Sequence, residues 1–231
     1  MIEESVKKLL SEVPAKNPFG EPVIVVAAVK TQQVAAINEA IAAGITDIGD
    51  NHVQEFRNKY AEIEGAPRRH FIGHLQTNKI KYLLGRCDLY QSVDRLSLAG
   101  ELSKKSAVAG VTSNVLLQIN AGNEETKGGF SFEEIDGAYD AVKAMPALNI
   151  QGLMAMLPFT DDQALLKKLA TEMRRIFDRL KARDHEIKYL SMGMSGDWKL
   201  CVECGSNMIR VGTTIFGQRV AAPRHINSKN T

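Results

Sequence analysis

The sequence predicts an α/β protein that forms a single closed (β/α)8 barrel of the TIM type, with an extra helix before the first strand. Short runs rich in β-branched residues alternate with longer segments of helical period, and about eight such units follow one another. The chain has 231 residues, a length typical of this barrel. No linker divides it before its polar end, so we expect a barrel domain over 1–219 and a C-terminal tail over 220–231. An open, doubly wound sheet is the alternative architecture.

Each predicted strand is a short apolar run next to a turn or a helical segment. The run at 23–29 is apolar throughout, which is typical of a strand buried on both faces. The predicted strands cover 23–29, 45–49, 70–72, 88–93, 114–119, 150–154, 188–192 and 208–211. A helix over 2–13 precedes the first strand, and helical segments separate the strands from one another.

Local signals indicate where several of these helices begin or end. Ser131 and Glu134 have the spacing of a capping box and predict the start of the helix after 114–119. Residues 160–163 open the longest helix, and Asp94 is expected to cap the helix after 88–93. Gly44 is a typical C-terminal glycine and ends the first helical segment after 23–29.

The composition argues against several classes of partner. Hydrophobic residues make up 44% of the chain and charged residues 24%, which is usual for a soluble globular protein. The formal charge is only +2 and no long basic block occurs, so neither nucleic acid nor an anionic membrane surface is expected as a partner. No apolar run is long enough for a membrane helix and the acidic start is unlike a signal peptide, so we expect a cytoplasmic protein. Its three cysteines are expected to be reduced.

Lys30 is the most informative single residue. In a (β/α)8 barrel the active site forms at the C-terminal ends of the strands. Lys30 directly follows the first apolar run, so its amine would project into the mouth of the barrel. A desolvated lysine has a lowered pKa and can form a Schiff base with an aldehyde. A lysine that only marks the end of a strand explains the position alone equally well.

The loops after the last two predicted strands favour a phosphate site. Barrels commonly bind phosphate with these loops and a helix N-terminus. Residues 193–196 offer the Ser195 hydroxyl and several backbone N–H groups, and 211–214 offer a second loop in which Gly212 permits a close approach. Each loop alone is more often an ordinary turn. Arg210 lies beside them, where its guanidinium would donate to a ring nitrogen or form an ordinary ion pair.

Three other motifs are better explained by structure than by chemistry. His70 and His74 are four residues apart, but the residues between them resemble a strand end, so the two rings would not share a helix face and no metal is expected. Cys201 and Cys204 form a CxxC without a second pair, which favours packing over zinc or redox chemistry. The glycines at 128–129 lack a nucleotide-binding pattern and predict a loop.

Along nearly its whole length, the chain resembles the YggS/PROSC family of pyridoxal phosphate homeostasis proteins. Residues 28–31 (AVKT) resemble the family's lysine motif, 49–55 (GDNHVQE) its GENYVQE block and 70–79 (HFIGHLQTNK) its HFIGxLQxNK block. Further matching blocks cover 92–94, 118–120, 151–156, 190–195, 209–213 and 215–217. The chain departs from the pattern at Val29, Asp50 and His52, where many members have serine, glutamate, and tyrosine or arginine.

This resemblance implies a barrel like the N-terminal domain of bacterial alanine racemase, the fold type III of proteins that use pyridoxal 5′-phosphate (PLP). It implies PLP as the cofactor, held as a Schiff base on Lys30, with the phosphate near the loops described above and Arg210 near the pyridine nitrogen. The cofactor-binding residues that the resemblance implies are Lys30, Asn51, Met194 through its backbone, Ser195, Arg210, Gly212 and Thr213. A guanidinium cannot accept a proton, so Arg210 would keep the ring nitrogen unprotonated and weaken PLP as an electron sink.

Two functions are compatible with this site. Alanine racemases place a catalytic tyrosine from a second domain opposite the lysine, and no tyrosine follows Gly217 in this sequence. We therefore expect a non-catalytic PLP carrier or regulator in vitamin B6 and amino-acid homeostasis. It would supply PLP-dependent apoenzymes and, because the racemase interface is missing, would be a monomer. The alternative is a weak PLP-dependent amino-acid racemase with Lys30 as its base.

Overall fold

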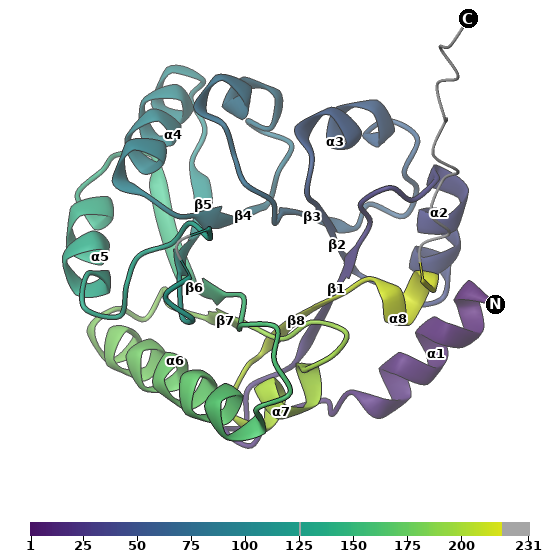
Figure 1. Ribbon diagram of the computed structural model, residues 1–231. Helices are drawn as coiled ribbons and strands as arrows, with labels where there is room; N and C mark the ends of the chain where they lie inside the picture. Colours follow the sequence, from purple (N-terminus) through teal and green to yellow (C-terminus); the bar gives the residue numbers. More distant parts are fainter. Residues whose placement is uncertain (125, 219–231) are drawn as a thin grey trace, which may run out of the picture.

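All eight predicted apolar runs form strands, which pair in chain order, and β8 pairs with β1 to close a parallel barrel (Figure 1). This computed structural model describes residues 1–124 and 126–218. The closed barrel confirms the predicted (β/α)8 architecture and excludes the open sheet. The predicted tail over 220–231 lies outside the described residues.

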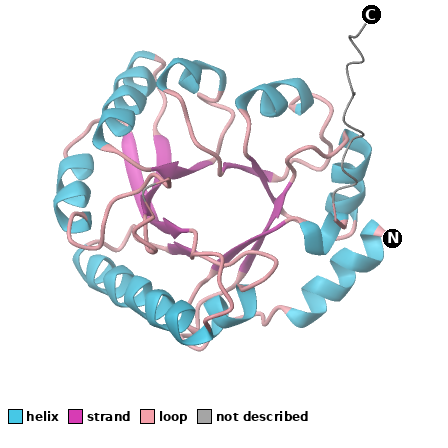
Figure 2. Ribbon diagram, viewed as in Figure 1, coloured by secondary structure: helices cyan, strands magenta, loops and turns pink. Residues whose placement is uncertain are grey.

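Helices surround the strands as an outer ring, which Figure 2 shows in cyan around the magenta barrel. The strands are β1 (Ile24–Ala28), β2 (Asp47–Asp50), β3 (Arg68–Phe71), β4 (Leu89–Val93), β5 (Ser113–Ile119), β6 (Leu148–Ala155), β7 (Tyr189–Ser191) and β8 (Met208–Val211). The helices are α1 (Ile2–Glu12), α2 (Val34–Ala42), α3 (Val53–Lys59), the 3-10 helix η1 (Thr77–Tyr82), α4 (Leu96–Val108), α5 (Ile135–Lys143), α6 (Gln163–Arg183), α7 (Trp198–Glu203) and α8 (Thr213–Phe216). The short α8 directly after β8 was not predicted.

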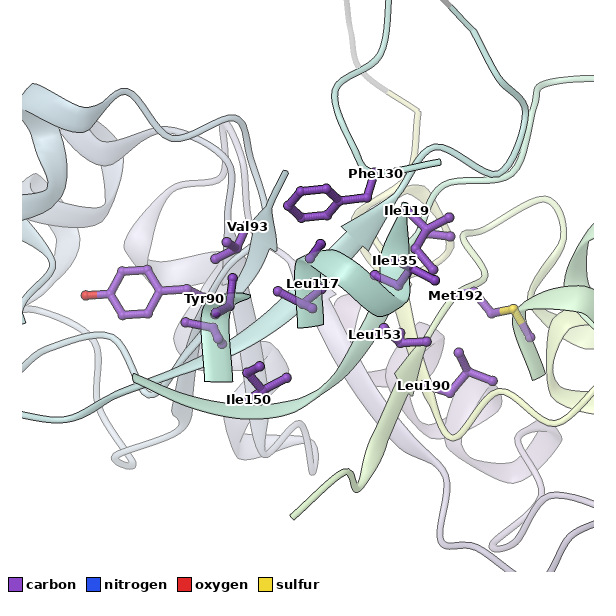
Figure 3. Close-up of a cluster of buried hydrophobic side chains, with 14 of the residues drawn as sticks. Tyr90, Val93, Leu117, Ile119, Phe130, Ile135, Ile150, Leu153, Leu190 and Met192 are labelled. Atoms are coloured by element: carbon purple, nitrogen blue, oxygen red, sulfur yellow. The ribbon is translucent and has the colours of Figure 1, made fainter. Parts of the chain in front are cut away.

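Alternation along the strands divides the hydrophobic core into an inner and an outer layer. On β1, Val26 packs with Leu116 and Met208 from other strands inside the barrel, whereas its neighbours Val25 and Ala27 pack with helix residues outside it. Figure 3 shows part of the outer layer, where apolar side chains of β4 to β7 meet α5. Because apolar neighbours face outward, polar side chains at the alternate positions of these strands face the barrel interior.

Two of the three predicted helix starts are confirmed by their hydrogen bonds. Ser131 N–H donates to Glu134 Oε2 (2.9 Å) and Glu134 N–H donates to Ser131 Oγ (3.1 Å), which is the reciprocal capping box, directly before α5. Asp162 caps α6 by accepting from Leu165 N–H (2.9 Å).

The predicted cap at Asp94 is wrong. The residue before α4 is Arg95, and no side chain caps that helix. The Asp94 carboxylate instead bonds to the Arg95 guanidinium and lies 3.2 Å from His74 Nδ1. Two nearby cationic or donor groups therefore compete successfully with the helix amides for this carboxylate.

A buried ion-pair cluster ties α6 to the turn that precedes β1. The Arg174 guanidinium donates to Glu21 (2.6 Å), to Asp178 (2.6 Å) and to the carbonyl oxygen of Gly205 (3.1 Å). It also lies 3.8 Å from the centre of the Phe19 ring. Since Arg174 is only 7% exposed, these partners replace the water that its charge loses on folding.

Candidate functional site

Lys30 lies just beyond the end of β1, at the mouth of the barrel, in a turn that α3 holds. Thr31 has a φ of 65°, a left-handed conformation that is uncommon outside glycine. The Thr31 N–H donates to Glu55 Oε2 (2.7 Å), and Lys59 Nζ contacts the same oxygen (2.8 Å) and donates to the carbonyl oxygen of Val29 (3.3 Å). The backbone is therefore fixed on both sides of Lys30, which is itself half-buried.

Glu55 is the charged centre of this contact. Burial acts to raise the pKa of Glu55, but the hydrogen bonds from Lys59 and from Thr31 N–H outweigh it and leave that pKa below its ordinary value. The carboxylate is therefore ionised at neutral pH and makes charge-assisted hydrogen bonds. Sequence-based reasoning gave Glu55 and Lys59 no role, although Glu55 closes the 49–55 block.

β2 brings two further polar side chains to the same rim. The parallel register pairs Ala28 of β1 with Gly49 of β2, and Lys30 and Asn51 each follow two residues later at the same end of the barrel. Oδ1 of Asn51 and Oδ1 of Asp50 are buried and accept no hydrogen bond from the described residues. Burial raises the pKa of Asp50 to about 6. Asn51 also lines a pocket of about 340 Å³ that lies between residues of α3 and η1 and extends to His74 and Lys79.

The structure brings Ser195 together with the segment that follows β8. Ser195 Oγ accepts from the backbone N–H groups of Gly212 and Thr214, both at 3.4 Å. A Cβ on Gly212 would lie 3.3 Å from the carbonyl oxygen of Ala28, so this loop runs tightly against β1. Thr213 begins α8 between the two amides. A hydroxyl and two N–H groups are thus grouped in one place, and an anion would bind here by taking over the two long amide contacts to the hydroxyl.

Met194 lies in the same loop, but its backbone is already engaged. Its N–H donates to Asp197 Oδ1 at 2.6 Å. The amide can contribute to an anion site only if the Asp197 carboxylate gives up this bond. The amide of Thr214, which sequence-based reasoning did not single out, is directed to the Ser195 hydroxyl instead.

Arg210 lies deeper in the barrel than the rim residues, because the β1–β8 register pairs it with Val26. Its side chain is 5% exposed, and it donates from Nη1 to Ser191 Oγ (2.6 Å) and from Nη2 to the carbonyl oxygen of Ala155 (2.8 Å). Burial lowers the pKa of Arg210 to about 10, so the guanidinium is still a cation at neutral pH. Both of these acceptors are neutral, which leaves the charge available to a ligand.

The other candidate side chains do not join this site as a metal or redox centre. His70 lies inside the barrel, with Nε2 2.9 Å from Asp47 Oδ1, whereas His74 is exposed in the next loop. Over residues 1–124 and 126–218, no three His, Cys, Asp or Glu side chains are placed to bind a metal. Cys201 and Cys204 are free thiols on and beside α7, and burial raises the pKa of each.

Comparison with known proteins now places the chain in a family. Residues 16–220 match the family model of the alanine racemase N-terminal domain. The chain belongs to this family. A relative from Pasteurella multocida is 38% identical over 89% of this chain and 90% of its own length, and one from Aquifex aeolicus is 36% identical over 82% and 84%. Each is named pyridoxal phosphate homeostasis protein, which confirms the resemblance noted in the sequence.

A solved structure extends this comparison to three dimensions. PipY of Synechococcus elongatus is 31% identical, and the match covers 94% of this chain and 100% of PipY. The TM-score is 0.85 with the PipY structure without PLP and 0.82 with the PipY structure that has PLP bound. In the described part of the present chain, no helix is long and apolar enough to cross a membrane.

Proposed function

We propose that this protein binds PLP in the mouth of its barrel and acts as a carrier or regulator in vitamin B6 and amino-acid homeostasis, without robust catalysis. The observation that carries the proposal is the convergence of the Ser195 hydroxyl with the amides of Gly212 and Thr214, two to four residues from the buried cation Arg210. The names of the relatives and the PLP-bound structure of PipY support the choice of ligand.

The residues at the rim suit the polar groups of a phosphorylated pyridine aldehyde. Ser195, Gly212 and Thr213 bind the phosphate, with the Met194 amide joining them when Asp197 releases it. Arg210 donates to the pyridine nitrogen from the N–H groups that Ser191 and Ala155 do not use. Asn51 follows β2 at the same end of the barrel and contributes its side chain to the wall of the cofactor site. The family resemblance suggests these roles, and the donor and acceptor chemistry of the side chains is compatible with them.

Lys30 holds the cofactor covalently in this proposal. Its amine would be the group that forms a Schiff base with the aldehyde of the cofactor, with loss of one water molecule. Glu55 and Lys59 contribute by fixing the backbone around Lys30, so that the amine is directed to one place at the rim.

The same residues favour holding PLP over using it. Bound PLP supplies a conjugated ring that can delocalise an electron pair, most effectively when its nitrogen is protonated. Arg210 has only donors to offer, so it stabilises the unprotonated nitrogen. Racemisation also requires an acid and a base on opposite faces of the substrate, of which Lys30 is one. In the catalytic alternative, Lys30 is the base.

We further infer that residues 1–219 are the binding unit, that it acts as a cytoplasmic monomer and that PLP-dependent apoenzymes receive its cofactor. Light scattering of the purified chain checks the oligomeric state. Transfer is checked by mixing the loaded protein with an unloaded PLP enzyme in the presence of a trap for free PLP, because only direct transfer restores activity under those conditions.

The visible absorbance spectrum, followed by borohydride reduction and peptide mapping, tests the proposal. We expect a yellow wild-type protein labelled on Lys30, a colourless Lys30→Ala variant, and an unchanged Lys16→Ala control, since Lys16 is exposed and precedes β1 at the opposite end of the barrel. A wild-type protein that stays colourless and unlabelled after PLP is added would refute the proposal.

A second measurement separates the carrier from the catalyst. The loaded protein is incubated in deuterated water with a panel of amino acids, and exchange at Cα is followed by NMR. The carrier shows no more exchange than free PLP at the same concentration. Exchange at ordinary enzyme rates that disappears in Lys30→Ala would establish catalysis instead.

A further inference from the structure

A row of polar side chains crosses the interior of the barrel beneath the candidate site. One residue comes from each of β2, β3, β4, β7 and β8. These residues are Asp47, His70, Gln91, Ser191 and Arg210, and we call them the interior relay. None is more than 5% exposed. Their neighbours along the strands, such as Tyr90 and Leu190, belong to the outer hydrophobic layer, so alternation directs the relay inward.

Each member of the relay contacts the next at hydrogen-bond distance. Arg210 Nη1 lies 2.6 Å from Ser191 Oγ, and Ser191 Oγ lies 2.7 Å from Gln91 Oε1. Gln91 Nε2 lies 2.8 Å from His70 Nδ1, and His70 Nε2 lies 2.9 Å from Asp47 Oδ1. The relay is therefore continuous from β8 to β2.

The two ends of the relay determine the direction of every hydrogen bond. Arginine only donates and an ionised carboxylate only accepts. Ser191 accordingly accepts from Arg210 and donates to Gln91 Oε1. The Gln91 amide then donates to His70 Nδ1, which leaves the His70 proton on Nε2 to donate to Asp47. A single arrangement satisfies all four bonds, so the relay has no equally good alternative.

The far end of the relay carries a negative charge. Burial acts to raise the pKa of Asp47, but hydrogen bonds from His70 and Thr46, together with the Arg68 guanidinium 3.7 Å away, bring that pKa below its ordinary value. The buried cation Arg210 and the anion Asp47 are thus joined by three neutral polar side chains. Such a network is stabilising only when its buried groups are paired, and each of the four bonds of the relay joins one donor to one acceptor.

We propose that the interior relay positions Arg210 toward the pyridine nitrogen of the bound cofactor, so that Gln91, His70 and Asp47 affect a ring that they do not touch. The inference rests on the proposed function, because it assigns a role toward PLP. Gln91, His70 and Asp47 are positioning residues, and Ser191 transmits their effect by holding one Nη atom.

The side chain of Arg210 explains why positioning is needed. It has several rotatable bonds, and in a dry barrel each unsatisfied N–H group would be costly. Ser191 and the Ala155 carbonyl occupy one Nη atom each and fix the guanidinium plane. Removal of the Ser191 hydroxyl takes away one of these two anchors, and the plane can then turn away from the ring nitrogen.

The test uses the full chain loaded with PLP that carries ¹⁵N in its ring. The chemical shift of this nitrogen reports its hydrogen bond directly, and a merely structural role would not move it. The variants are Ser191→Ala, which removes one oxygen, and Gln91→Met, which keeps a similar volume and breaks the relay at its middle. Ser106→Ala is the matched control, because Ser106 is also fully buried and bonds to another side-chain hydroxyl, that of Ser113, outside the relay.

We expect both relay variants to move the ring-nitrogen shift, and Ser191→Ala to raise the Kd for PLP by about tenfold, the effect of one hydrogen bond to a charged group. Ser106→Ala should leave both quantities unchanged. If Ser191→Ala loads and has the wild-type shift, the relay does not position Arg210. A wild-type chain that takes up no PLP would instead refute the proposed function, and the role of the relay with it.

Discussion

Asp50→Asn should stabilise the protein at neutral pH and lose most of this effect in acid. Asp50 is 1% exposed, its Oδ1 accepts no hydrogen bond from the described residues, and burial raises its pKa from 3.8 to about 6. Between these two values the unfolded chain is ionised while the folded chain keeps the proton, so stability falls as the pH rises. At about 1.4 kcal/mol per pKa unit, the charged carboxylate costs about 3 kcal/mol above pH 7. Asparagine resembles the protonated form and avoids that cost.

Urea unfolding of the wild type and of Asp50→Asn at several pH values measures this effect. We expect the difference between their free energies of unfolding to grow by about 2 kcal/mol between about pH 4.5 and about pH 7.5. Asp47→Asn is the control from the same strand, and its effect should have the opposite sign. The pKa of Asp47 is lowered, so the loss of its charge should destabilise the protein at neutral pH. An Asp50→Asn difference that does not change with pH would refute this reasoning.

Three further predictions concern the rim and the cluster around α6. Ser195→Ala should weaken PLP binding about tenfold but leave the binding of pyridoxal, which lacks the phosphate, unchanged. A fluorescence titration measures both affinities. Equal losses of affinity for the two ligands would show that Ser195 does not bind the phosphate. Glu55→Gln keeps the shape of the side chain but removes the charge that binds Thr31 N–H and Lys59. It should weaken PLP binding about fivefold and lower the free energy of unfolding by about 1 kcal/mol. A variant with wild-type affinity for PLP would show that α3 does not position Lys30. Arg174→Met leaves the half-buried Glu21 with Lys181 and Asn17 as its remaining partners and should cost about 2 kcal/mol in urea unfolding, with little change in PLP affinity. A loss below about 0.5 kcal/mol would contradict the importance of the Arg174–Glu21 ion pair.

Most of the strands were predictable because they contain runs of aliphatic residues, as β1 and β5 do, and in a parallel barrel such runs are buried on both faces. Boundaries were less exact. The predicted strand over 70–72 is β3 at Arg68–Phe71, because two arginines concealed its beginning. The prediction that Asp94 caps α4 was wrong for a related reason. Its carboxylate bonds to the side chains of Arg95 and His74, and the sequence does not indicate that either side chain would turn toward it.

The candidate site was predictable where one residue follows a strand, as Lys30, Ser195 and Gly212 do. The contacts that hold those residues were not, since Glu55 reaches the turn of Lys30 from another helix. Gln91 and Ser191 gave a signal that went unused: each is a polar residue with an apolar neighbour in a predicted strand, and a buried polar residue needs a partner. Only the closed barrel shows that Ser191 donates a hydrogen bond to Gln91.

The pairing of β1 with β8 has a consequence for the order in which the site is completed. Lys30 is synthesised before Ser195, Arg210 and Gly212, and the segment after β8 comes beside the end of β1 only when β8 pairs with β1. A partly synthesised chain therefore has a lysine without the loops that would hold a phosphate beside it. A ligand that contacts both the end of β1 and the loops after β7 and β8 would stabilise the pairing of β8 with β1. The ligand would therefore have to leave before these two strands separate.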